Sequence, residues 1–165
     1  MPLAVTSYEF SVFIHITAVV VGFGATFAES ITFPVAMTMN KRYLPYVHRL
    51  QRKINQWFAG PALLVILATG FYQVSDADLE FGDFWLSSSL TIVIILSALI
   101  GGYFIPEDRR LESMAERDIA ASGTGEVELS QEYLRRSRRE GIAGGLTGLL
   151  IVAAIYLMVT KPGLS

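Results

Sequence analysis

Cysteine is absent from this chain of 165 residues, and histidine occurs only twice. The lack of cysteine excludes disulfide bonds, thiolate metal sites and thiol catalysis, and it leaves the redox compartment undetermined. Glycine-rich phosphate loops of the Walker type are also missing, which excludes ATP-driven pumping through that motif. No Lys or Arg precedes the first apolar stretch, so the charged leader of a secretory signal is missing, and we expect this stretch to be retained as a helix.

Long apolar blocks dominate what is present, since 52% of the residues are hydrophobic. A helix needs roughly 20 residues to cross the hydrocarbon layer of a membrane. Four stretches are close to that length or exceed it: 10–28, 57–74, 84–105 and 142–160. They predict an all-α fold in a lipid bilayer, an antiparallel four-helix bundle that forms one domain over residues 1–165.

Positive charge is distributed unevenly between the two sides of this bundle. Five Lys or Arg residues lie between the first two spans, seven arginines lie between the last two, and only Lys161 falls on the other side. Because Lys and Arg resist translocation, we expect both of those loops in the cytoplasm and both termini outside. The loop 106–141 begins at Pro106 and is interrupted by GTG at 123–125, which predicts a cytoplasmic helical hairpin or spur. Its nine acids offset its seven arginines, so we expect no nucleic-acid partner.

Small and polar residues share one face of each predicted span and should point into the bundle. On the first span this face carries Ser11, His15, Ala18, Gly22, Thr26 and Glu29, whereas Phe13, Val20, Phe23, Phe27 and Ile31 should meet lipid. The second span aligns Asn55, Ala62, Thr69 and Gln73, and the third aligns Ser87, Thr91, Ala98 and Gly101. On the fourth span two overlapping GxxxG patterns, Gly141 with Gly145 and Gly144 with Gly148, predict close helix packing.

His15 is the residue on which a functional interpretation of this sequence mainly depends. An imidazole inside a membrane span is either a structural hydrogen-bonding group or a ligand, and depth in the bilayer makes Thr69 and Thr91 its expected neighbours. One reading is a structural hydrogen bond to Thr69, Thr91 or a backbone carbonyl. The other is a haem ligand, because haem requires only one protein ligand and apolar walls, and Thr69, Thr91 and Gly22 would then border the cofactor at His15. Without a His-x-x-x-His pair or an acid at the depth of His15, no metal site beyond that iron is expected.

Three further residues near the cytoplasmic boundary are candidates for an ion pair or an ion path: Glu29, Arg52 and Asn55. We expect Glu29 to pair with the basic loop, at Arg49, Arg52 or Lys53. The second histidine, His48, lies in YVHRLQRK among charged residues and is expected to be solvated at the membrane interface.

Four segments carry a resemblance to a known family: YEFSVFIHITAVVVGFGA, NQWFAGPALLVILATG, LSALIGGYFIPEDRR and QEYLRRSRREGIAGGLTGLLIVAAIYLMVTKPG. Together they resemble bacterial four-span integral membrane proteins that are known only as a domain of unknown function. The most specific part is the ending YLMVTKPG preceded by SRR. This resemblance implies a multi-pass protein of the bacterial cytoplasmic (inner) membrane, and it carries no activity.

A more distant similarity is to the HemJ-type protoporphyrinogen oxidases and to the copper-resistance D membrane domain. In the HemJ pattern the first-span histidine is linked to haem binding, and His15 is the matching position. Arg52 and Gly70 match the basic residue and the glycine of the second span. The third span, WLSSSLTIV, lacks the lysine of HemJ-type proteins, so the resemblance implies haem ligation rather than oxidase activity. Copper binding would involve Met37, Met39 and His48, but a packing role explains the presence of these three residues equally well.

The sequence leaves three classes of function open. The first is a haem-binding or redox protein that uses His15, with the cofactor held by one chain or shared by a homodimer. The second is a small channel or transporter for protons, ions or a small solute. The third is an accessory subunit of a larger membrane complex. Whether the protein is an enzyme stays open.

Overall fold

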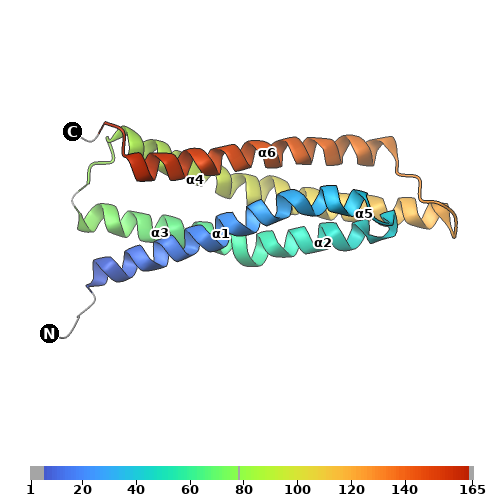
Figure 1. Cartoon of the computed structure of the whole chain (residues 1–165), viewed down its shortest axis with the longest axis horizontal. Coiled ribbons are helices and arrows are strands. Elements are labelled where there is room, and N and C mark those ends of the chain that lie inside the picture. The colour runs from blue at the N-terminus through green and yellow to red at the C-terminus, as the bar shows by residue number, and fades with distance from the viewer. Residues whose placement is uncertain (1–5, 78, 164–165) are drawn as a thin grey trace.

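A computed structural model describes residues 6–77 and 79–163, and every regular element in these ranges is a helix. The elements are α1 (Ser7–Met37), the 3-10 helix η1 (Lys41–Tyr43), α2 (Leu44–Ile54), the π-helix η2 (Asn55–Ala59), α3 (Gly60–Asp76), α4 (Phe84–Leu99), the π-helix η3 (Ile100–Phe104), α5 (Ile105–Ser122) and α6 (Gln131–Thr160). They form four long rods that lie side by side, with the start of α1 and the end of α6 at the same end (Figure 1).

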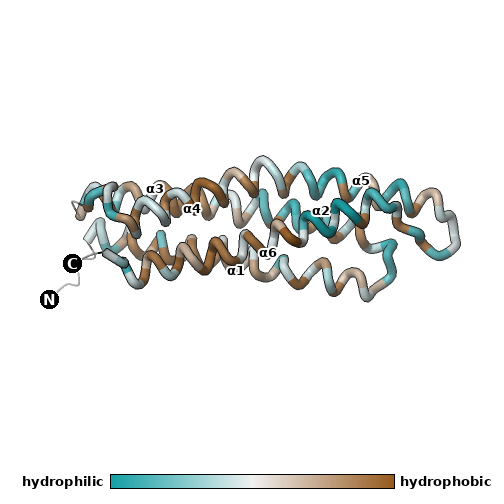
Figure 2. The backbone as a smooth tube through the Cα atoms, turned by 90° about the horizontal axis from the view of Figure 1, so that it is seen from above, coloured by the Kyte–Doolittle hydropathy of each residue, from teal (hydrophilic) through white to brown (hydrophobic). Residues whose placement is uncertain are grey.

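Each of the four rods contains a stretch long and apolar enough to cross a membrane, which confirms the predicted all-α four-helix bundle. The rods are 31, 36, 39 and 30 residues long. At 1.5 Å per residue they measure about 45–60 Å, well over the ~30 Å of the hydrocarbon layer. The excess lies at one end, where hydrophilic residues gather on α2 and α5 (Figure 2). We call this end the polar half and the end that holds α3 and α4 the apolar half.

The segment 106–141 is helical as predicted, but it is not a separate hairpin. α5 continues the third span through η3, and α6 runs without interruption from the polar half to Thr160. Pro106 does not stop the helix: it lies two residues beyond η3, and the rod continues through it into α5. Gly123 does stop it, because its φ of 55° belongs to a left-handed conformation that glycine adopts without strain.

The lipid-facing side of α1 is mostly as predicted. Phe13, Val20 and Ile31 are exposed on the outside of the bundle, where lipid would meet them. Phe23 is the exception, because it is buried in the core of the apolar half. That core also contains Leu63, Leu96 and Ile151, so one aromatic ring from α1 fills space between the other three rods.

The inward face predicted for the third span is wrong. Thr91 is exposed, and its hydroxyl donates a hydrogen bond to the Ser87 carbonyl within α4. The buried face of α4 instead carries Trp85, Ser89 and Val93. A threonine that satisfies its hydroxyl on its own helix has no need of a partner across the bundle, so its polarity does not indicate its direction.

Glycines mark where rods approach and where they separate. α1 packs chiefly on α3, and a Cβ added at Gly22 would lie 2.7 Å from the Ala62 Cβ. By contrast, a Cβ added at Gly141, Gly144 or Gly145 would meet nothing within 4 Å. The GxxxG patterns of α6 therefore do not make the close helix contact that the sequence predicted. α6 packs chiefly on α4 and leaves space on the side of α1.

Candidate functional site

A cavity of about 320 Å³ lies between α1 and α6, where the polar half meets the apolar half. The two π-helical segments contact each other at this level and supply Asn55, Ile100 and Phe104 to its wall. Its other lining residues are Thr26, Glu29, Ser30, Phe33, Pro34, Gln51, Asp108, Ser137, Glu140, Gly141, Gly144, Gly145 and Thr147. The glycines of α6 thus provide room for a cavity, because any larger side chain at those positions would enter it.

Three acids reach this cavity: Glu29 from α1, Asp108 from α5 and Glu140 from α6. Among the described residues, no Lys or Arg forms an ion pair with any of them. Carboxylates removed from water without a counter-charge are expensive. The cavity is therefore suited to a cation.

Several other polar atoms at the cavity have no partner. Glu29 Oε1, Gln51 Oε1, Ser137 Oγ and Thr147 Oγ1 are buried and form no hydrogen bond within residues 6–77 and 79–163. Thr147 is only 1% exposed. Because buried polar groups in proteins are nearly always hydrogen-bonded, these four atoms indicate a site that binds a ligand or ordered water.

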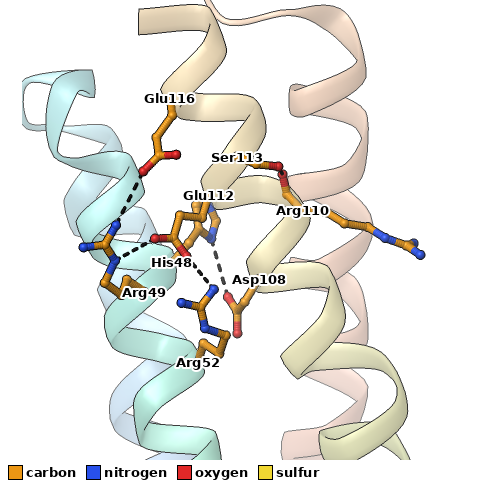
Figure 3. A network of polar contacts seen from close by, with 8 residues as sticks. All are labelled: His48, Arg49, Arg52, Asp108, Arg110, Glu112, Ser113 and Glu116. Carbon is orange, nitrogen blue, oxygen red and sulfur yellow. Dashed lines mark hydrogen bonds and ion pairs between the residues drawn. The ribbon is translucent and has the colours of Figure 1, made fainter.

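His48 is fully buried, at 0% exposure, so the prediction of a solvated interfacial residue is wrong. Its Nε2 lies 2.8 Å from the Tyr133 hydroxyl, and the rings of Phe33 and Tyr133 pack around it. Its Nδ1 forms no hydrogen bond and lies 3.5 Å from Asp108 Oδ1, in the direction that Figure 3 shows. Nε2 of His48 is thus hydrogen-bonded to Tyr133, and Nδ1 faces the carboxylate of Asp108.

Glu140 joins this pair. One ligand-type atom each from His48, Asp108 and Glu140 lies within 4.8 Å of the other two. The sequence does not reveal this group, because its members are 60 and 32 residues apart along the chain and lie away from the depth of His15. Three side chains that commonly ligate metals therefore meet at the polar end of the cavity.

The basic residues of α2 are occupied elsewhere. Arg49 Nε donates to Glu112 Oε1 over 2.6 Å, Arg52 binds the other oxygen of Glu112, and Arg49 also reaches Glu116 (Figure 3). Lys53 lies over the Trp57 ring. The predicted pairing of Glu29 with Arg49, Arg52 or Lys53 is therefore wrong. The arginines neutralise Glu112 and form no ion pair with the acids of the cavity in the described part of the chain.

Another acid, Glu107, is neutralised by an arginine in the same way. Arg136 binds both carboxylate oxygens of Glu107, over 2.8 and 3.1 Å. Glu107 and Asp108 are neighbours in sequence, yet only Asp108 faces the cavity. The distribution of arginines thus separates structural acids, which are paired, from cavity acids, which are not.

His15 lies in the apolar half and has the neighbour that its depth predicted. Its Nδ1 is 2.8 Å from Thr69 Oγ1, and that hydroxyl also lies 2.6 Å from the Val65 carbonyl. Because the threonine proton goes to the carbonyl, the histidine donates from Nδ1, which leaves Nε2 as an acceptor. The adjoining pocket is small, about 40 Å³, and borders Gly70.

The other residues predicted to surround His15 lie elsewhere. Thr91 points away from the bundle, and Gly22 packs against Ala62. Asn55 is buried at the larger cavity, and Arg52 is bound to Glu112. Of the predicted cofactor neighbours, the structure brings only Thr69 to His15.

A signal for the missed residues was present in the sequence. Leu44, Val47 and His48 recur at helical spacing opposite Arg49 and Lys53, so the amphipathic pattern of α2 places His48 on the apolar face. Asp108, Leu111 and Ala115 repeat the pattern in α5, and Tyr133, Ser137 and Glu140 do so in α6. The signal is a polar residue on the apolar face of an otherwise solvated helix, because that position predicts a buried side chain.

Comparison with known proteins gives a family and no activity. A family model described as "Predicted integral membrane protein (DUF2269)" matches residues 10–162. No curated protein and no solved structure matches. The similarity to HemJ-type oxidases and to the copper-resistance D domain is therefore not shown. Because the match covers nearly the whole chain, this protein belongs to the DUF2269 family of predicted integral membrane proteins and lies in a lipid bilayer as a multi-pass protein.

Proposed function

We propose that this protein transports a small inorganic cation, and that the cavity between α1 and α6 is its binding site. The observation that carries the proposal is the set of three cavity acids, Glu29, Asp108 and Glu140, with no Lys or Arg paired to any of them in the described part of the chain. A cation that enters this cavity supplies the missing counter-charge, and an anion is repelled.

Closure of the apolar half supports transport rather than an open channel. The cavity lies toward the polar half, and below it Phe23, Leu63, Leu96 and Ile151 close the centre of the apolar half. The space that remains among these side chains is about 10 Å³, which is no more than one water molecule needs. A site that is sealed on the side of the apolar half is compatible with one state of alternating access.

The two π-helical segments supply a means of movement. Asn55–Ala59 is followed by Gly60 and Pro61, and Ile100–Phe104 is followed by Ile105 and Pro106. π-turns and prolines are the usual places where helices bend. Because both lie at the level of the cavity, a tilt of α2 and α5 relative to α3 and α4 opens or closes the site.

The side of entry follows from charge. With twelve of the thirteen Lys and Arg residues in the loops of the polar half, the positive-inside rule places that half in the cytoplasm. In a bacterial inner membrane the cavity of this conformation therefore faces the cytoplasm.

Uptake into proteoliposomes tests the proposal. Purified protein is reconstituted, and influx of H⁺, Na⁺ and Mn²⁺ is followed with an entrapped pH dye and by elemental analysis. We expect flux of at least one cation that falls to the level of empty liposomes in the double variant Glu29→Gln/Glu140→Gln. Glu128→Gln, an exposed acid of the loop, is the matched control and should retain full flux. Equal flux in all three proteins and in empty liposomes contradicts a transport role.

Haem binding at His15 is a second candidate, favoured by the free Nε2 that the Thr69 hydrogen bond leaves. The pocket of about 40 Å³ beside His15 is far below the roughly 300 Å³ at which ligand sites begin, so a second copy of the chain would have to complete a haem site. A visible spectrum of the purified protein tests this: a haem band that His15→Ala removes supports it, and a band that His15→Ala leaves unchanged excludes His15 as the ligand. An accessory role in a larger complex stays a prediction of the sequence.

A further inference from the structure

We propose that His48, Asp108 and Glu140 form a binding site for a divalent first-row transition-metal ion. The inference rests on the proposed cation-binding role of the cavity and names the ion class and its ligands. It depends on one juxtaposition: a fully buried imidazole from α2 and two carboxylates, from α5 and α6, whose ligand-type atoms all lie within 4.8 Å of one another.

The spacing is close to what coordination requires. Ligand atoms at about 2.1 Å from a tetrahedral ion lie about 3.4 Å apart, so the widest separation needs to shorten by at most about 1.4 Å around a metal. His48 and Asp108 are already at 3.5 Å. Glu140 is only half-buried, and rotation of its side chain brings its carboxylate nearer to the other two.

The imidazole is oriented for this role. The Tyr133 hydroxyl holds His48 Nε2 at 2.8 Å, and Nδ1 is left without a hydrogen bond in a fully buried side chain. Metal-bound histidines typically use the second ring nitrogen to anchor the ring in this way. With a metal on Nδ1, the Nε2 proton is donated to the Tyr133 oxygen and every polar atom of the ring is satisfied.

A plain His48–Asp108 ion pair explains the arrangement less well. The pair at 3.5 Å is longer than a charge-assisted hydrogen bond, which is about 2.7–2.9 Å. It also leaves the Glu140 carboxyl group beside that of Asp108 with no cation between them. A divalent cation between them neutralises both carboxylates and satisfies Nδ1.

The chemical types of the three ligands limit which metal ions can bind. One imidazole nitrogen and two carboxylate oxygens suit Mn²⁺, Fe²⁺, Co²⁺ or Zn²⁺. Mg²⁺ and Ca²⁺ prefer oxygen ligands alone, and Cu⁺ prefers the thiolate and thioether sulfur that this site lacks. Asp108 and Glu140 both line the cavity, and Ser137, one turn before Glu140 on α6, has an unpartnered hydroxyl there that suits metal-bound water.

Binding to the full chain in detergent tests the site. Protein freed of metal with a chelator is titrated with Co²⁺, followed by its visible absorption, and with Mn²⁺, followed by EPR. We expect one ion per chain. Each of the nearly isosteric variants His48→Gln, Asp108→Asn and Glu140→Gln should raise the Kd by more than about 100-fold, beyond the 10–100-fold that loss of an outer partner produces. His15→Ala and Glu128→Gln should leave the Kd unchanged.

A second measurement needs no change at the site. Pulsed EPR of Mn²⁺ bound to the wild-type chain detects a directly coordinated imidazole nitrogen, and we expect that signal to persist in His15→Ala, which leaves His48 as the only histidine. Absence of saturable binding, absence of the nitrogen signal, or affinity unchanged in all three ligand variants overturns the inference.

The two experiments distinguish an error in the proposed metal site from an error in the proposed transport role. Flux of H⁺ or Na⁺ that depends on Glu29 and Glu140, in a protein that binds no Co²⁺ or Mn²⁺, overturns the metal site and keeps the transport role. Stoichiometric metal binding through His48 without flux of any cation keeps the site and overturns transport.

Discussion

His48 Nε2 and the Tyr133 hydroxyl lie 2.8 Å apart, and both side chains are completely buried. The two residues are 85 positions apart in sequence and belong to different rods, α2 and α6. Because water does not reach them, each group depends on the other for its hydrogen bond. The bond fixes the imidazole so that its second nitrogen faces Asp108 at the end of the cavity.

Tyr133→Phe should therefore destabilise the protein. The change leaves His48 Nε2 without a partner in a buried position, which costs about 1–3 kcal/mol. Thermal unfolding in detergent measures the effect. Tyr156→Phe, on an exposed tyrosine of α6, is the control and should leave the melting temperature unchanged. Identical melting of the two variants would contradict the buried hydrogen bond.

Gly22→Ala tests the close approach of α1 and α3. The new methyl group would lie 2.7 Å from the Ala62 Cβ, so the helices must separate, and overpacking of this kind costs about 1–3 kcal/mol. Gly24→Ala, two residues further along α1, has open space around its Cβ and should be neutral or gain up to about 1 kcal/mol from helix propensity. A ranking of the two variants opposite to this in unfolding experiments would refute the predicted contact.

Gly144→Leu should block the cavity without unfolding the bundle. Gly144 lines the cavity and has no atom within 4 Å of an added Cβ, so a leucine side chain occupies space reserved for the cation and its water. We expect a loss of at least about 90% of cation uptake in proteoliposomes. Gly24→Leu places the same side chain on the outside of α1 and should retain uptake. Full uptake by Gly144→Leu would show that the ion does not pass through this cavity.

Arg52→Gln should destabilise the polar half much more than Arg49→Gln. Both arginines bind Glu112, but the side chain of Arg52 is 14% exposed and that of Arg49 is 57% exposed. Loss of the partly buried partner costs about 3 kcal/mol, whereas exposed pairs contribute about 1 kcal/mol or less. Chemical denaturation of the two variants compares these losses, and equal losses would indicate that Arg52 is not the main partner of Glu112.

Much of the fold could be predicted because hydrocarbon imposes simple rules. Apolar length alone located the four spans, and depth along the first span correctly paired His15 with Thr69. The faces were harder to predict. Thr91 and the glycines of α6 were assigned inward by residue type, yet a hydroxyl bonded to its own helix and a glycine beside a cavity need no close neighbour.

The candidate metal site could not be predicted from spacing. His48, Asp108 and Glu140 lie on three rods and are brought together only when α2, α5 and α6 extend beyond the bilayer as one bundle. The sequence predicts solvated helices in the segment 106–141 and a solvated interfacial position for His48, and a histidine or an acid in such a place requires no partner. Which acids the arginines neutralise is likewise a matter of tertiary geometry, since Glu107 and Asp108 are adjacent and have opposite environments.

The π-turns in the two longest rods affect how changes in chain length are tolerated. A π-turn holds one residue more than the α-helical turn it replaces, so each segment stores a surplus residue at the centre of the molecule. If a single residue is deleted within Asn55–Ala59 or Ile100–Phe104, the π-turn can convert to regular α-helix. The helix faces on either side of the deletion then keep their orientation relative to each other. The same deletion within α2 or α5 rotates everything beyond it by about 100° and separates His48 from Asp108. Indels in this protein should therefore be tolerated at mid-rod, the place where most bundles tolerate them least.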